Sequence, residues 1–192
     1  MLLLFVLLTI LIVFILIKMR SKRRNEYIEN YQFPDIILAK FTEKHKDLTD
    51  ADIKLVIKEL KKYFYLSSLS SDILIMPSIV LDDLWHEFIL YTKEYNSFCN
   101  KAFGSFLHHS PNDTMSFDIE LARFLIWEKS CKLEGLDPSS TSTSTLPCMF
   151  KIDEVLKIKD GLYYAAIKEK YWYQKYNIKS NKSNLISIEY KK

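Results

Sequence analysis

The first seventeen residues contain no charged side chain and a single polar one, Thr9. As a helix, this segment reaches about 25 Å at 1.5 Å per residue, close to the roughly 30 Å of the hydrocarbon core of a bilayer. Lys18 and Arg20 follow it, and their long side chains extend the spanned length by reaching toward the headgroups. The sequence therefore predicts a transmembrane anchor over residues 1–19.

A cleaved signal peptide is the alternative for such a segment. Signal peptides begin with basic residues, have a shorter apolar core and end at a small-residue cleavage site. Here no basic residue precedes the apolar run, and the sequence KMRSKRR follows it directly. These flanks favour an uncleaved anchor.

The charge around the anchor predicts its orientation. Basic residues beside a membrane helix stay on the cytoplasmic side. No acid precedes Glu26, and five cations lie in the seven residues after the apolar run: Lys18, Arg20, Lys22, Arg23 and Arg24. We therefore expect a single-pass protein with its C-terminal domain in the cytoplasm, a basic juxtamembrane linker over residues 20–33, and membrane lipids as a partner of residues 1–24.

Cysteine usage agrees with a reducing compartment. The three cysteines are widely spaced and form no CxxC pair: Cys99, Cys131 and Cys148. An odd number of separated cysteines predicts reduced thiols rather than a disulfide framework or a zinc knuckle.

The remaining chain predicts an all-α fold, a compact helical domain over residues 34–176, because apolar residues recur at steps of three and four. The serine- and threonine-rich residues 139–145 form a polar linker inside it, and residues 177–192 form a flexible C-terminal tail. Start and stop signals place helices from Pro34, from Thr49, over residues 77–103 with Gly104 as a cap, over 116–134, and over 161–176.

The candidate chemistry lies on the predicted central helix, 77–103. Asp82 and His86 are four residues apart and therefore share a face. His108 and His109 follow the helix break at Gly104, so they are able to fold back toward His86. Imidazole and carboxylate are ligands of divalent transition metals such as zinc. These residues are therefore candidate ligands, with Glu87 as a candidate base.

The same residues also have a structural interpretation. Asp82 or Asp83 pairs with His86 along the helix, and His109 caps a helix or bonds a backbone carbonyl. The spacing is not the HExxH pattern of zinc proteases, so it does not diagnose a metal by itself. His45 lies in a lysine-rich loop, and we expect it to be exposed to solvent.

The string DDLWHEFIL at residues 82–90 resembles a family of bacterial proteins called glycine-rich domain-containing. The resemblance covers roughly residues 49–163 and includes FLHHSP at 106–111, EGLDP at 134–138 and LPCMF at 146–150. Plant relatives are distantly similar around the Asp-x-x-Trp-His core, but Phe88 stands where they commonly carry a second histidine. The glycine-rich tail is absent. The resemblance implies a helical domain and assigns no catalytic role.

Two functions follow from these observations. The first is an interaction or scaffold module, with the tyrosine-rich segment 163–176 as a surface for a protein partner. The alternative is a metal-dependent enzyme, a hydrolase for example, that uses the Asp/His cluster. Nucleic acid is not an expected partner, because the lysines are scattered among acids and no reading motif is present.

Overall fold

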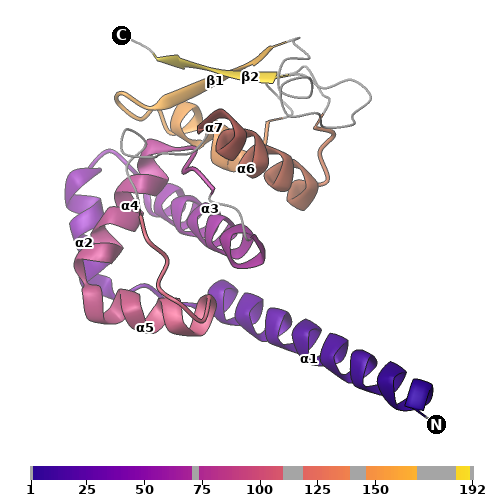
Figure 1. Ribbon diagram of the computed structural model, residues 1–192. Coiled ribbons are helices and arrows are strands. Elements are labelled where there is room, and N and C mark those ends of the chain that lie inside the picture. Colours follow the sequence, from indigo (N-terminus) through magenta and orange to yellow (C-terminus); the bar gives the residue numbers. More distant parts are fainter. Residues whose placement is uncertain (1, 71–73, 110–118, 139–145, 168–184, 191–192) are drawn as a thin grey trace.

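The computed structural model describes residues 2–70, 74–109, 119–138, 146–167 and 185–190 (Figure 1). This part of the chain is mostly helical, as predicted, but it also contains a two-stranded sheet that the all-α prediction lacked. Its elements are α1 (Leu2–Asn30), α2 (Asp35–Lys44), α3 (Asp50–Leu69), α4 (Ile79–Leu90), α5 (Thr92–Ala102), α6 (Ile119–Glu134), α7 (Cys148–Val155), β1 (Leu162–Ile167) and β2 (Leu185–Tyr190).

The helix α1 is long and apolar enough to cross a membrane. Its 18-residue window of highest mean hydropathy, 2.4, is not buried at all inside the molecule. The other end of α1 belongs to the domain, because Ile28 is 1% exposed and packs in the core. The linker expected at 20–33 is therefore helical as far as Asn30, since no glycine or proline interrupts the sequence before Pro34.

The predicted starts of the next two helices are confirmed. Pro34 is the N-cap of α2, and Thr49 is the N-cap of α3. The Thr49 hydroxyl accepts a hydrogen bond from the backbone N–H of Asp52 (3.3 Å), and the Asp52 carboxylate accepts one from the backbone N–H of Thr49 (2.9 Å). This reciprocal cap fixes the first turn of α3.

The predicted central helix 77–103 is wrong as a single helix, because Tyr91 leaves the helical conformation (φ −89°, ψ 65°) and separates α4 from α5. Figure 1 shows the two helices running in different directions. In a straight helix, Phe88 and Phe98 would lie about 15 Å apart along the axis. The bend brings their ring centroids to 5.3 Å, and both rings pack on Tyr31. Burial of the apolar faces of both halves therefore explains the break.

The predicted helix 161–176 is also wrong in its described part, where residues 162–167 form β1. This strand pairs antiparallel with β2, with Leu162 opposite Tyr190 and Ile167 opposite Leu185. Tyrosine and isoleucine favour strands, and Tyr164 is buried while Tyr163 is only partly so. β2 also places a paired strand inside the segment for which the sequence predicted a flexible tail. The linker 139–145 lies outside the described residues.

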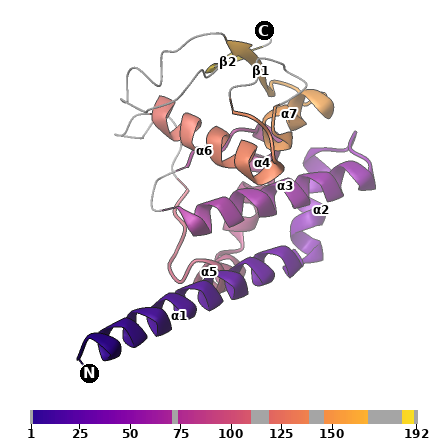
Figure 2. The same ribbon diagram turned by 90° about the vertical axis from the view of Figure 1, so that its right-hand side faces the viewer.

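The elements stack in layers on either side of α3. Both views place α1 and α5 on one side of α3, and α6, α7 and the β-hairpin on the other (Figure 2). The predicted fourth helix is confirmed as α6, which ends at Gly135 with a φ of +67°, a conformation that favours glycine. The core between the layers is rich in aromatic side chains: Phe41, Phe64, Phe88, Tyr95, Phe98, Phe124 and Phe150 are fully buried.

All three cysteines are free thiols, as predicted. Burial is the main cause that raises the pKa of the Cys148 thiol to about 11 and that of Cys131 to about 12, and burial also raises the pKa of Cys99. Because the thiolate is the reactive form, we expect alkylation of the folded protein at pH 8 to be about a hundredfold slower than alkylation in denaturant. Mass spectrometry of iodoacetamide-treated protein measures both rates. Rapid labelling of the folded protein would contradict this prediction.

Candidate functional site

The first turn of α4 positions the candidate site. Ser78 caps this helix by accepting a hydrogen bond from the backbone N–H of Leu81 (3.2 Å). Asp82 and His86 then lie one turn apart on the same face, as their spacing predicted. The Asp82 Oδ2 and His86 Nδ1 atoms are 3.3 Å apart.

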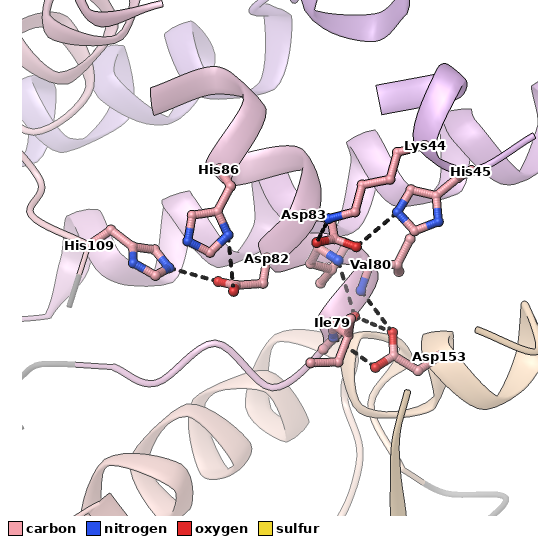
Figure 3. Close-up of polar contacts among 11 residues, drawn as sticks. Lys44, His45, Ile79, Val80, Asp82, Asp83, His86, His109 and Asp153 are labelled. Atoms are coloured by element: carbon pink, nitrogen blue, oxygen red, sulfur yellow. Dashed lines mark hydrogen bonds and ion pairs between the residues drawn. The ribbon is translucent and has the colours of Figure 1, made fainter. Parts of the chain in front are cut away.

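His109 reaches the same carboxylate from the loop that follows α5 (Figure 3). Its Nε2 atom lies 2.8 Å from Asp82 Oδ1, and its ring lies 4.4 Å from the His86 ring between centroids. Tyr95 holds this loop in place, because its hydroxyl donates to the Leu107 carbonyl (2.6 Å) and accepts from the Trp85 indole (3.0 Å).

Asp82, His86 and His109 form a cluster of candidate metal ligands. One ligand atom from each lies within 4.8 Å of the other two. Donors bound at about 2.0–2.1 Å to one tetrahedral ion lie roughly 3.4 Å apart, and the three atoms here lie within a larger distance, 4.8 Å, of one another. The His109 side chain is 14% exposed and the His86 side chain is 50% exposed, so the cluster opens to the surface on the His86 side.

The other predicted site residues lie elsewhere. His108 is exposed, and its ring packs 4.9 Å from that of Phe106 instead of joining the cluster. Glu87 is half-buried on α4 and does not belong to the cluster. The structure therefore brings together three of the four candidate ligands and not the candidate base.

Asp83, the neighbour of Asp82, makes a separate contact with α2 and the loop after it. Its carboxylate pairs with Lys44 and with His45, whose Nε2 atom lies 2.9 Å from Asp83 Oδ2. The His45 side chain is only 13% exposed and packs 4.7 Å from the Phe41 ring. The expectation that His45 is exposed to solvent is therefore wrong. Its loop packs against α4, which local sequence does not reveal.

Asp153 is a buried carboxylate that sequence reasoning missed. It lies on α7, is 1% exposed and caps the N-terminus of α4, a different helix (Figure 3). It accepts hydrogen bonds from the Ser78 hydroxyl (2.7 Å) and from the backbone N–H groups of Ile79 (2.8 Å), Val80 (3.2 Å) and Leu162 (2.9 Å). A negative charge at a helix N-terminus is stabilising. Asp153 thus joins α7, β1 and the helix that carries Asp82.

A second buried ionic network joins α3 to α6. The Lys62 ammonium lies 2.8 Å from Glu59 and 2.6 Å from Glu134. Burial is the main cause that raises the pKa of Glu59, and Lys62 opposes this effect. Because Lys62 occupies the space between the two carboxylates, this network is a structural ion cluster rather than a metal site.

The aromatic segment expected to bind a protein partner offers little exposed surface where it is described. Tyr164 is buried, its hydroxyl donates to the Pro77 carbonyl (2.8 Å), and its ring packs 4.9 Å from Phe150. Tyr163 is partly buried, and residues 168–176 lie outside the described residues. The surface for a protein partner over residues 163–176 therefore stays a prediction.

Comparison with known proteins yields one family match. A family model described as UCP032817-like matches residues 23–184 of the chain. No curated protein and no solved structure matches the chain. The resemblance to glycine-rich domain-containing proteins is therefore wrong, because the family model that matches is a different one.

Proposed function

The chain belongs to the UCP032817-like family, and because that description names no activity, we propose a function from the geometry itself: a membrane-anchored domain that binds one divalent transition metal through Asp82, His86 and His109. The site has three protein ligands and an exposed side. That arrangement is typical of catalytic metal sites, which keep a coordination position for water or substrate. The proposed activity is therefore metal-dependent hydrolysis.

The anchor supports the location in this proposal. A fully exposed apolar window in α1 needs a nonaqueous environment, because about 25 cal/mol is lost for each Å² of apolar surface left in water. The five cations between Lys18 and Arg24 favour a cytoplasmic position for the rest of the chain. The proposed protein is thus single-pass, with its metal-binding domain in the cytoplasm.

One observation carries the metal proposal: an imidazole and a carboxylate of α4 and the imidazole of His109, from the loop after α5, converge within 4.8 Å. Asp82 holds both histidines in this arrangement, so little rearrangement is needed when an ion replaces the shared protons. Two histidines and one carboxylate suit zinc and also ferrous iron. We expect zinc in the absence of a reductant, since its affinity for such ligands exceeds that of ferrous iron.

A zinc titration of the full-length protein in detergent tests the proposal. We expect one zinc ion per chain, with affinity reduced about a hundredfold or more in His86→Ala and in His109→Ala because each loses one of three protein ligands. His108→Ala is the matched control, since that histidine is adjacent in sequence but outside the cluster. Isothermal calorimetry and metal analysis after dialysis measure affinity and stoichiometry.

Equal zinc binding by the wild type and the two ligand variants would contradict the proposal. Loss of binding in His108→Ala alone would also contradict it, because it would assign the site to the wrong histidine.

A further inference from the structure

The continuity of α1 fixes the distance between the domain and the membrane that the helix would enter. Arg20 and Arg24 lie three and seven residues after Ile17, the last residue of the uncharged apolar run, so their backbones are about 4.5 and 10 Å beyond it along the helix. The headgroup layer on each side of a bilayer is roughly 5–8 Å thick. Side chains on a helix tilt toward its N-terminus, and both guanidinium groups therefore lie at the level of the headgroups.

The loop after α5 lies beside these two guanidinium groups. At Gly104 an added Cβ would collide with the Arg24 guanidinium and would lie 3.1 Å from the Arg20 guanidinium. Gly104 also has a φ of +81°, which disfavours other residues. Both views show α5 alongside α1, on the side of the domain from which the apolar part of α1 projects (Figures 1 and 2). The segment 103–107 is thus the part of the domain at headgroup depth.

The exposed side chains of this segment suit a membrane surface. Phe106 is 40% exposed, and its ring packs edge-on against Tyr95, with ring centroids 5.2 Å apart. This contact fixes the ring while part of it stays at the protein surface. No acidic residue occurs between Tyr95 and His109, and exposed Lys101 adds to the charge of Arg20 and Arg24. Aromatic rings favour the headgroup interface, and basic groups attract anionic lipids.

We propose that the loop 103–107 rests on the headgroups of the bilayer that α1 enters, with Phe106 inserted at the interface and anionic lipids beside Arg20, Arg24 and Lys101. This inference depends on the anchor in the proposed function and not on the metal. A lipid surface is favoured over a protein partner because the same helix that carries the basic residues leads directly into the apolar segment.

Fluorescence quenching by brominated lipids tests this docking. Full-length wild type, Phe106→Trp and Val155→Trp are reconstituted into phosphatidylcholine–phosphatidylserine vesicles, with bromine placed on the acyl carbons nearest the headgroup. Val155 is the matched control, because it is an exposed apolar residue (61%) on α7, on the opposite side of α3 from α1. We expect the fluorescence added by Phe106→Trp to be quenched at least twofold, as is typical for an indole at interface depth, and that added by Val155→Trp to be unchanged.

Quenching of Phe106→Trp that is no greater than that of Val155→Trp would overturn the proposal and leave the loop facing water or another protein. An alkaline carbonate wash of the same vesicles tests the anchor separately. Release of the wild type in that wash would overturn the anchor, and with it the docking, whereas retained protein without selective quenching would overturn the docking alone. Neither result depends on zinc binding.

Discussion

The Asp153→Ala variant is expected to lose about 3–5 kcal/mol of unfolding free energy, because it leaves three buried or half-buried backbone N–H groups and the Ser78 hydroxyl without their acceptor. The effect extends beyond α7, since Asp153 fixes the first turn of α4 and the start of β1. Urea denaturation of the full-length protein in detergent, followed by near-ultraviolet circular dichroism, measures the change.

Two variants control for this result. Glu154→Ala removes the adjacent, exposed carboxylate and is expected to change stability by less than about 0.5 kcal/mol. Asp153→Asn retains one acceptor oxygen but directs an amide NH₂ at backbone donors, so we expect an intermediate loss. An Asp153→Ala variant as stable as Glu154→Ala would show that the buried cap is absent.

The Trp85→Ala variant is expected to lose about 3–5 kcal/mol as well, through removal of a large buried ring. Trp85 is 3% exposed and packs against Tyr63, with ring centroids 5.3 Å apart, and edge-on against Phe64 at 5.7 Å. Its indole also donates to the Tyr95 hydroxyl, which in turn holds the Leu107 carbonyl. The midpoint and slope of the urea transition measure the loss.

Trp85→Ala is also expected to weaken zinc binding about tenfold or more, because the Trp85 ring packs edge-on at 4.5 Å against His109 and positions that ligand. Trp85→Phe separates the two effects: it retains most of the ring but removes the indole N–H that bonds Tyr95. Relative to Trp85→Ala, we expect Trp85→Phe to regain most of the lost unfolding free energy but less of the lost zinc affinity. An unchanged denaturation midpoint in Trp85→Ala would contradict the position of this residue in the core.

Local sequence predicted those parts of the fold that local physics determines. The helix α3 begins at Thr49, as expected, where Thr49 and Asp52 cap it, and Gly135 ends α6 in the conformation that favours glycine. The exposed apolar run of α1 is evident from composition alone. Each of these features depends on residues within one or two helical turns of each other.

The bend at Tyr91 and the β-hairpin depend on contacts between distant segments, and local sequence did not predict them. No proline or glycine marks the bend, which is explained by the packing of Phe88 and Phe98 on Tyr31. The two alanines of β1 favour a helix locally, but this segment pairs with β2, some twenty residues later, and its Tyr164 packs on Phe150.

The site divides in the same way. The spacing of Asp82 and His86 predicted their shared face correctly, because one helix sets it. Whether His108 or His109 reaches Asp82 depends on how the loop after α5 is held. The Tyr95 hydroxyl holds it through the Leu107 carbonyl, twelve positions away, and local sequence does not reveal this contact. Asp153 approaches α4 from more than seventy positions away, and nothing in its own neighbourhood marks it as a cap.

X-ray absorption at the zinc edge of the zinc-loaded, full-length protein tests the metal centre most directly. The proposed ligands predict a first shell of nitrogen and oxygen at about 2.0–2.1 Å, with the outer-shell signal of two imidazoles that falls to one in His109→Ala. A shell of sulfur at about 2.3 Å, or a shell of oxygen alone without imidazole, would contradict a centre built from Asp82, His86 and His109.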